Sequence, residues 1–167
     1  MELTLLEKAI NGDKKALKEL ITQNSEYIYK LAFIHTKYEN DAIQIMKNTI
    51  EDINSNIRKF SKFKSFDKHI TRTTLKHINE YIKNVGIIQY EEDTNYLNKN
   101  GYIDMYKAID LLDNYEKNII VLLYFYKMSY KEIGDILDMN ESTVKMYVRN
   151  SLKLMQNVAK EENINGK

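Results

Sequence analysis

The sequence contains no cysteine and no proline, and it has only 5 glycines among its 167 residues. Without cysteine, the chain has no disulfide framework and no thiolate for zinc binding or nucleophilic catalysis. Proline and glycine are the residues that interrupt helices most strongly, so their near absence favours long helices. In a chain rich in Lys, Ile, Leu, Asn and Glu, this composition predicts an all-α protein.

Long apolar runs and the marks of a secreted protein are also missing. No stretch approaches the roughly 20 apolar residues that a membrane helix needs. The first residues lack the basic region, apolar run and cleavage site of a secretory signal. A hydrophobic content of 43% and a charged content of 29% are typical of a globular protein. We therefore expect a cytoplasmic protein without a membrane partner.

Residues for enzymatic chemistry are scarce. The chain has 3 histidines, and His69 and His77 lack the close acidic or histidine partner of a helical metal site. The glycines stand apart from one another, so none belongs to a glycine-rich phosphate loop. We expect no metal, no cofactor and no catalytic residue, and hence a protein that is not an enzyme.

Apolar residues recur at helical spacing through the first half of the chain, which predicts one helical bundle over residues 1–84. Asp13 and Ser25 are expected to cap two separate helices, and Asn40 precedes a third. A fourth helix is expected over residues 66–83. The third helix has the clearest apolar stripe, formed by Ala42, Ile45, Met46, Thr49, Ile50, Ile53 and Ile57.

Helical periodicity fails between residues 85 and 104, where the charge also turns acidic. This segment contains one cation, Lys99, and four acidic residues, Glu91, Glu92, Asp93 and Asp104. It also contains several asparagines, which favour turns. This composition predicts a flexible linker over residues 85–104. A second helical domain is predicted over residues 105–167, with short helices and a frayed end.

Residues 128–150, MSYKEIGDILDMNESTVKMYVRN, have the most specific pattern in the chain. Ser129 and Glu132 match a capping box at the start of one helix. Asn140 matches the cap of the next helix, and only three residues separate the two helices. Gly134 is placed where a second helix can approach closely. Two short helices across so short a turn predict a helix-turn-helix.

The second helix of this motif is predicted to bury Val144, Val148, Ser151 and Leu152. Its solvent-facing residues suit the major groove of DNA, because they combine cations, hydrogen-bonding groups and apolar side chains that reach base edges or phosphates. These candidates are Ser142, Thr143, Lys145, Met146, Tyr147, Arg149 and Asn150. An ordinary helical hairpin with a solvated polar face is the alternative.

A second candidate surface lies between residues 56 and 84, where cations greatly outnumber acids and alternate with aromatic residues. Cations contact a nucleic-acid backbone while aromatic rings stack on unpaired bases, so the composition suits a single-stranded site. A basic solvated helix face with phenylalanines in the core is the alternative. The candidates are Lys59, Phe60, Lys62, Phe63, Lys64, Phe66, Arg72, Lys76 and Lys83.

Residues 108–145, AIDLLDNYEKNIIVLLYFYKMSYKEIGDILDMNESTVK, resemble domain 4 of sigma-70 family factors of the small extracytoplasmic-function type. The matching motifs are Leu112, Lys117, Ser129-Tyr130, Glu132 to Gly134 and Thr143 to Lys145. Residues 41–83 resemble domain 2 of the same family more weakly. Ile43, Gln44 and Lys47 replace the acidic pair and glutamine that are usual in that family's polymerase-binding helix, and His69 stands where tryptophan is usual.

The resemblance implies a transcription initiation factor that binds core RNA polymerase and directs it to promoter DNA. Its second domain would read the minus-thirty-five element, its basic aromatic segment would capture a flipped base of the minus-ten element, and the acidic linker would thread the polymerase channel. An anti-sigma factor is a further candidate partner. The implied polymerase contacts lie on the helix over residues 41–57, namely Asp41, Gln44, Lys47, Asn48 and Glu51.

Two other functions stay open from the sequence. One is a helix-turn-helix regulator that does not replace a sigma factor and uses its first domain for dimerisation or sensing. The other is a protein-interaction adaptor that keeps the scaffold but no longer melts DNA. A stoichiometric complex with core polymerase would separate the first from a sigma factor.

Overall fold

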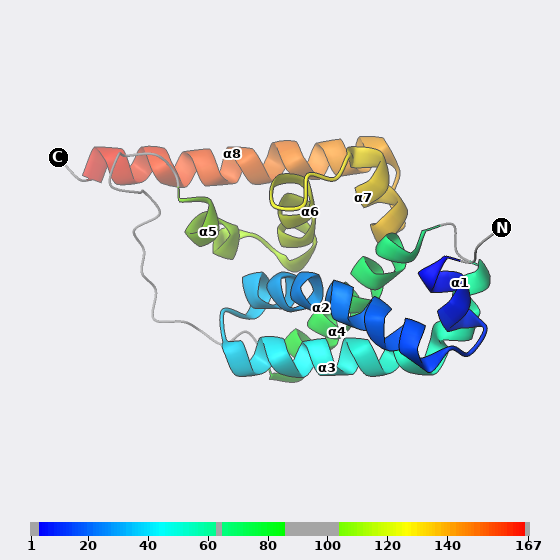
Figure 1. The fold of residues 1–167 in the computed structure, drawn as a ribbon. Helices are drawn as coiled ribbons and strands as arrows, with labels where there is room; N and C mark the ends of the chain where they lie inside the picture. Colours follow the sequence, from blue (N-terminus) through cyan, green and yellow to red (C-terminus); the bar gives the residue numbers. More distant parts are fainter. Residues whose placement is uncertain (1–3, 63–64, 86–103, 166–167) are drawn as a thin grey trace. The chain divides into compact units, whose positions relative to one another are not determined.

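The computed structural model describes residues 4–62, 65–85 and 104–165 (Figure 1). These residues form helices and turns without a strand, which confirms the all-α prediction. The chain divides into two compact units, Met1–Gly86 and Ile87–Lys167. The linker predicted over residues 85–104 lies outside the described residues except at its two ends, so it stays a prediction.

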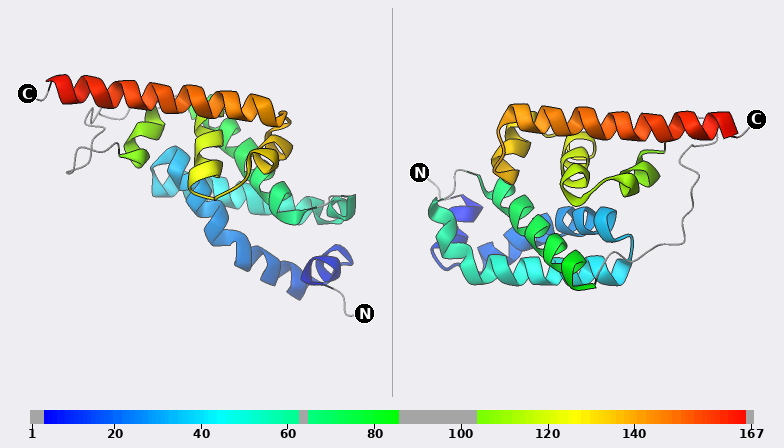
Figure 2. Two further views of the ribbon diagram at one scale, coloured as in Figure 1. Left: turned by 90° about the horizontal axis from the view of Figure 1, so that it is seen from above. Right: turned by 180° about the vertical axis from the view of Figure 1, so that it is seen from behind.

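Unit 1 is a helical bundle centred on one long helix. That helix, α2, packs against α1, α3 and α4, and α3 also packs against α4. Both views in Figure 2 show α1 beside the N-terminal end of α2. The elements are α1 (Leu5–Ile10), α2 (Lys14–Thr36), α3 (Glu39–Asn56), the 3-10 helix η1 (Ile57–Lys62) and α4 (Phe66–Val85).

Asp13 caps α2 as predicted, because its carboxylate accepts hydrogen bonds from the backbone N–H groups of Lys15 and Ala16 at 2.8 and 3.1 Å. Gly12, at φ 97°, adopts a backbone conformation that favours glycine and lets the chain turn between α1 and α2. The prediction that Ser25 caps a separate helix is wrong. Its hydroxyl donates to the Ile21 carbonyl at 2.8 Å, so α2 continues through this residue.

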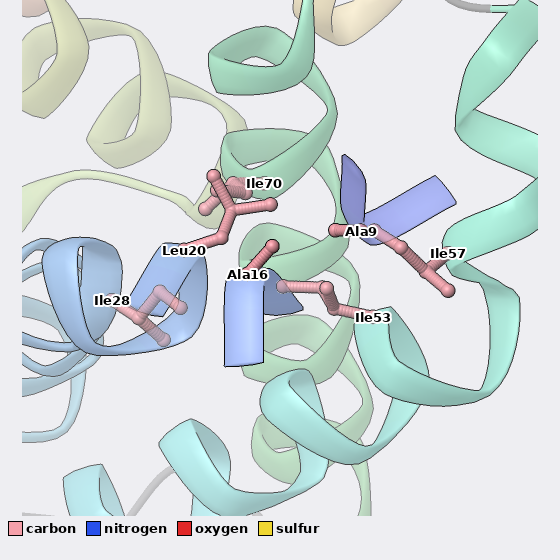
Figure 3. Close-up of a cluster of buried hydrophobic side chains, with 7 residues drawn as sticks. All are labelled: Ala9, Ala16, Leu20, Ile28, Ile53, Ile57 and Ile70. Atoms are coloured by element: carbon pink, nitrogen blue, oxygen red, sulfur yellow. The ribbon is translucent and has the colours of Figure 1, made fainter. Parts of the chain in front are cut away.

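The core of unit 1 joins residues from all of its helices. Figure 3 shows side chains from α1, α2, α3, η1 and α4 converging on one cluster. The predicted stripe of α3 supplies its share, since Ala42, Ile45, Thr49 and Ile53 are buried and Met46 and Ile50 pack beside the cluster. Burying one of the isoleucine side chains fully is worth about 1.5–3 kcal/mol. The cluster residues are Ala9, Ala16, Leu20, Ile28, Ile53, Ile57 and Ile70.

Unit 2 consists of short helices packed along one long helix. The long helix, α8, packs against α6, α7 and the 3-10 helix η2. The elements are α5 (Met105–Ala108), η2 (Ile109–Leu111), α6 (Asn114–Tyr124), α7 (Tyr130–Leu137) and α8 (Glu141–Asn165).

The prediction that all helices of this unit are short is wrong for α8, which has 25 residues. No proline or glycine interrupts the sequence between Gly134 and Gly166, and Met155 is buried, so packing supports the helix well beyond the turn. The core around it is mainly apolar, with Ile119, Ile120, Leu122, Ile133 and Val144 at 0% exposure, and the buried hydroxyl of Ser151 donates to the Tyr147 carbonyl at 2.9 Å.

Candidate nucleic-acid interface

The connection between α7 and α8 has the predicted caps at both helix starts. Ser129 and Glu132 form a reciprocal capping box at α7. Asp138 ends α7 in the left-handed conformation, at φ 55°. Asn140 then accepts a hydrogen bond from the Thr143 backbone N–H at 2.8 Å. Two capped helices across Asp138, Met139 and Asn140 form the predicted helix-turn-helix.

Gly134 is buried where the turn folds back onto α7. A Cβ atom at this position would lie 2.5 Å from the Met139 carbonyl oxygen. The Gly134 carbonyl accepts the backbone N–H of Met139 at 2.9 Å, so this part of the turn is held close to α7. The prediction that a second helix approaches Gly134 is therefore wrong in its partner, because the backbone of the turn makes the close approach.

The face of α8 predicted to contact DNA is largely open to solvent. Ser142, Lys145, Arg149 and Asn150 are exposed, Met146 is 50% exposed, and the candidates Thr143 and Tyr147 are half-buried. The opposite face packs inward as predicted, because Val144, Val148 and Ser151 are buried and Leu152 is half-buried. The residues predicted to contact DNA and the residues predicted to be buried therefore lie on separate faces of α8.

Three of the candidates at the start of α8 already have partners within the motif. The hydroxyl groups of Ser142 and Thr143 both donate to Asn140 Oδ1, at 2.5 and 2.9 Å. Lys145 Nζ lies 2.6 Å from Glu141 Oε1 and 5.6 Å from the centre of the Tyr130 ring.

The sequence reasoning did not include Glu141 and Tyr130 among the functional residues. The spacing of four between Glu141 and Lys145 is a known signal for helical ion pairs. No such local signal identifies Tyr130, which belongs to the preceding helix.

A hollow of about 310 Å³ lies between the end of α3, η1 and α4 in unit 1. It brings together three of the cations predicted for the minus-ten site, Lys59, Arg72 and Lys76. Lys83 is exposed in the last turn of α4. The full lining is Asp52, Asn56, Lys59, His69, Arg72, Thr73 and Lys76.

The aromatic candidates between residues 56 and 84 differ in what the structure describes of them. Phe66 is half-buried and packs against the hydrophobic core, which is the alternative role that the sequence left open. Phe66 is the first residue of α4, and burial of its apolar ring against the core cluster is favourable. The side chains of Phe60, Lys62, Phe63 and Lys64 lie outside the described residues, so their stacking and backbone contacts stay predictions.

Asp52 of α3 organises the wall of the hollow. Its Oδ2 atom lies 3.2 Å from Lys76 Nζ and 3.1 Å from His77 Nε2 on α4, and its Oδ1 atom accepts from the Asn56 amide at 2.7 Å. Burial alone would raise the pKa of Asp52, but the hydrogen bond and charge of Lys76, together with the hydrogen bonds of His77 and Asn56, outweigh it and lower the pKa.

Three cations and one carboxylate line the same hollow, and this environment changes the pKa of His69. Burial first, and then the Arg72 guanidinium, lower the pKa of His69 below its ordinary value. This residue stands at the position where the family that the sequence resembles has tryptophan. At neutral pH, a lowered pKa leaves the imidazole ring uncharged, so His69 can present a neutral ring beside the cations.

We expect Asp52→Asn to lower the free energy of unfolding at pH 7 by about 1 kcal/mol, since the charged partner of Lys76 is lost but the exposed lysine stays solvated. The folded-state pKa of Asp52 lies below its unfolded value, so the stabilisation is present above about pH 4 and is lost as the pH falls through the folded pKa. Urea unfolding at pH 7 and pH 3 measures the difference in the free energy of unfolding between wild type and Asp52→Asn. Glu51→Gln, on exposed α3 surface, is the matched control, and a difference from wild type that is the same at both pH values would contradict the expectation.

The residues predicted for polymerase binding lie along one side of α3. Gln44, Lys47 and Glu51 are exposed, and Asn48 is half-buried. The Gln44 amide donates to Asn48 Oδ1 at 2.9 Å. Asp41 is half-buried and faces Tyr81 of α4.

Burial, with the hydrogen bond and negative charge of Asp41, raises the pKa of Tyr81 to about 12. Asp41 therefore helps to fix the start of α3 against α4, and the exposed part of this surface is formed by the other residues.

The fold and these surfaces define a DNA-binding protein that has a helix-turn-helix in unit 2 and a basic hollow in unit 1. The family described as Sigma-70, region 4 matches residues 102–155, and a family described as a helix-turn-helix domain matches residues 3–55. RNA polymerase sigma factor SigV of Bacillus subtilis (strain 168) is 30% identical over 152 residues, which cover 86% of this chain and 90% of SigV.

Two solved structures share the fold. CnrH in complex with the cytosolic domain of CnrY superposes with a TM-score of 0.73 at 15% identity, covering 95% of this chain and 96% of CnrH. The sigma factor RpoE in complex with the anti-sigma factor NepR from Bartonella quintana superposes with a TM-score of 0.69 at 15% identity, covering 87% and 98% of the two chains.

The chain therefore belongs to the sigma-70 family of RNA polymerase sigma factors. It is a DNA-binding transcription initiation factor that binds core RNA polymerase and directs it to promoters. Of the three functions that the sequence left open, the chain therefore has that of a sigma factor.

Within residues 4–62, 65–85 and 104–165, no helix is long and apolar enough to cross a membrane. The same described ranges contain no group of three or more His, Asp or Glu side chains arranged to hold a metal ion.

Proposed function

We propose that, in the cytoplasm, each of the two units recognises a different element of the promoter. The exposed side of α3 binds core RNA polymerase, the hollow beside α4 binds the melted minus-ten element, and α8 enters the major groove of the minus-thirty-five element. The chain contributes binding and DNA opening, while the polymerase supplies all of the catalysis.

The single observation that carries this proposal is the exposed face of the first three turns of α8. Arg149 and Asn150 are exposed, and within the described part of the chain no hydrogen bond or ion pair engages their side chains. An arginine without an internal partner loses no protein contact when it binds phosphate or guanine. The face thus combines cations with apolar and amide groups on a helix of the motif that reads major grooves.

The hollow in unit 1 supports the second part of the proposal. Lys59, Arg72 and Lys76 line it, and two of these cations are held by neighbours: Lys59 Nζ donates to Asn56 Oδ1 at 2.7 Å, and Lys76 pairs with Asp52. Cations held in this way can track the backbone of a single strand with little loss of side-chain entropy.

An anti-sigma factor is proposed as a third partner. The RpoE structure contains the anti-sigma factor NepR, and the CnrH structure contains the cytosolic domain of CnrY. The match to RpoE covers 98% of that chain, so a comparable surface is expected in this protein. Co-expression with candidate partner proteins and measurement of a stoichiometric complex would test this.

Arg149→Ala is expected to weaken binding to every DNA sequence about equally and to reduce the salt dependence by about one phosphate contact. The reason is that Arg149 lies two turns into α8, nearer the groove edge than the residues of the first turn. Binding curves on promoter and scrambled duplexes at two salt concentrations measure both effects.

Lys160→Ala is the matched control for that experiment, because it removes an exposed cation from α8 three turns further along. If Arg149→Ala leaves affinity unchanged on both duplexes, α8 is not the DNA-binding surface and the proposal fails.

A further inference from the structure

An acidic residue lies at the start of the helix that faces DNA. Glu141 is the first residue of α8, and its side chain is 48% exposed. Its Oε1 atom pairs with Lys145 Nζ at 2.6 Å. Within the described residues, no contact engages its other carboxylate oxygen. Glu141 therefore presents one open hydrogen-bond acceptor beside a cation.

The pair is held from both helices of the motif. The Lys145 ammonium lies 5.6 Å from the centre of the Tyr130 ring, which belongs to α7. A cation over an aromatic face is attracted by the ring quadrupole. Lys145 thus has one partner on its own helix, Glu141, and one on the preceding helix, Tyr130, and both favour a position of its ammonium group beside the Glu141 carboxylate.

A carboxylate at a DNA surface is unfavourable unless it finds a donor, because phosphate oxygens and most base edges repel it. The major groove offers amino donors at two places, N4 of cytosine and N6 of adenine, and glutamate is suited to the cytosine amino group. A lysine beside it is suited to the O6 and N7 acceptors of guanine. Glu141 and Lys145 together present an acceptor and a donor, which is the complement of a C·G pair.

We propose that Glu141 is a specificity-determining residue of the minus-thirty-five contact, whose carboxylate accepts a hydrogen bond from a cytosine N4 amino group. Lys145 donates to guanine of the same or the adjacent base pair. This inference rests on the proposed placement of α8 in the major groove.

The test compares holoenzymes that contain wild-type chain, Glu141→Ala or Glu141→Gln, on a promoter library randomised in the minus-thirty-five element. Wild type is expected to enrich cytosine at one position. Glu141→Ala should reduce that preference by roughly 5- to 100-fold, the range of a good side-chain–base hydrogen-bond pair. Glu141→Gln should move the preference toward adenine, because a glutamine amide can bond adenine N6 and N7.

Unchanged base preferences in both variants, with affinity shifted equally for all sequences, would overturn the inference and leave Glu141 as a partner of Lys145 alone. Circular dichroism and thermal unfolding confirm that the variants fold. An Arg149→Ala holoenzyme separates the two possible failures. If that variant loses affinity while the Glu141 variants keep wild-type preferences, only this inference fails, whereas unchanged affinity of Arg149→Ala contradicts the proposed function itself.

Discussion

Replacing Gln44 and Asn48 by alanine and Lys47 by glutamate is expected to weaken binding to core RNA polymerase by at least about 100-fold. Gln44 and Lys47 are exposed and Asn48 is half-buried beside them on α3, and hot-spot residues at the centre of an interface cost about 2 kcal/mol or more when they are truncated. The buried side of α3 is untouched, so the bundle should keep its helical content. Co-purification with tagged core polymerase and a titration of holoenzyme formation measure the effect.

A triple variant on α2 is the matched control for that experiment. Lys18→Glu, Thr22→Ala and Gln23→Ala make the same kinds of change at exposed positions of another helix of unit 1. The control is expected to bind polymerase as wild type does. Undiminished co-purification of the α3 variant would show that polymerase contacts this protein elsewhere.

Gly134→Ala is expected to destabilise unit 2 by roughly 1–3 kcal/mol, the usual cost of forcing extra volume into a packed site. Helix propensity alone predicts the opposite sign, since alanine stabilises a helix by about 1 kcal/mol relative to glycine. The Cβ atom, however, would lie 2.5 Å from the Met139 carbonyl oxygen. That oxygen belongs to the backbone of the turn, so α7 and α8 must move apart to relieve the contact.

Thermal unfolding and promoter binding should both report this displacement. Lys131→Ala, at an exposed position of α7, is the control and should leave both unchanged. A Gly134→Ala protein with a raised melting temperature and wild-type DNA affinity would mean that the turn relaxes at little cost. The family motif that the sequence resembles has alanine here, so the experiment also tests whether this chain holds its turn more tightly.

Local sequence signals predicted the helix-turn-helix well, because its determinants lie within a few residues of one another. The capping box of Ser129 and Glu132 and the Asn140 cap are short-range patterns, and both form in the structure. The apolar stripe of α3 was also predictable, since a period near 3.6 specifies which face is buried.

Features that depend on tertiary packing could not be predicted from local sequence patterns. Ser25 has the residue type of a helix cap, but burial of Leu20 and Ile28 on either side keeps α2 continuous. Asp52 and His77 lie 25 residues apart, and their pairing depends on how α3 and α4 pack. Likewise, Tyr130 meets Lys145 only because the turn places two helices together.

The candidate site was predicted as a set of residue types rather than as a geometry. Lys59, Arg72 and Lys76 were chosen for their charge, and the structure brings them around one hollow. Phe66 was chosen as an aromatic neighbour, but packing draws it against the core. Charge patterning thus indicates which surface is basic, whereas the division of aromatic rings between core and surface depends on packing.

Run-off transcription with purified core polymerase on genomic fragments tests the central claim most directly. Core polymerase with this chain is expected to produce discrete transcripts from a defined set of promoters. Those transcripts should be reduced by Arg149→Ala and lost with the α3 triple variant. If core polymerase and the chain together give no promoter-specific transcript, while the chain still binds DNA through α8, then it is a helix-turn-helix DNA-binding protein that does not direct polymerase to promoters.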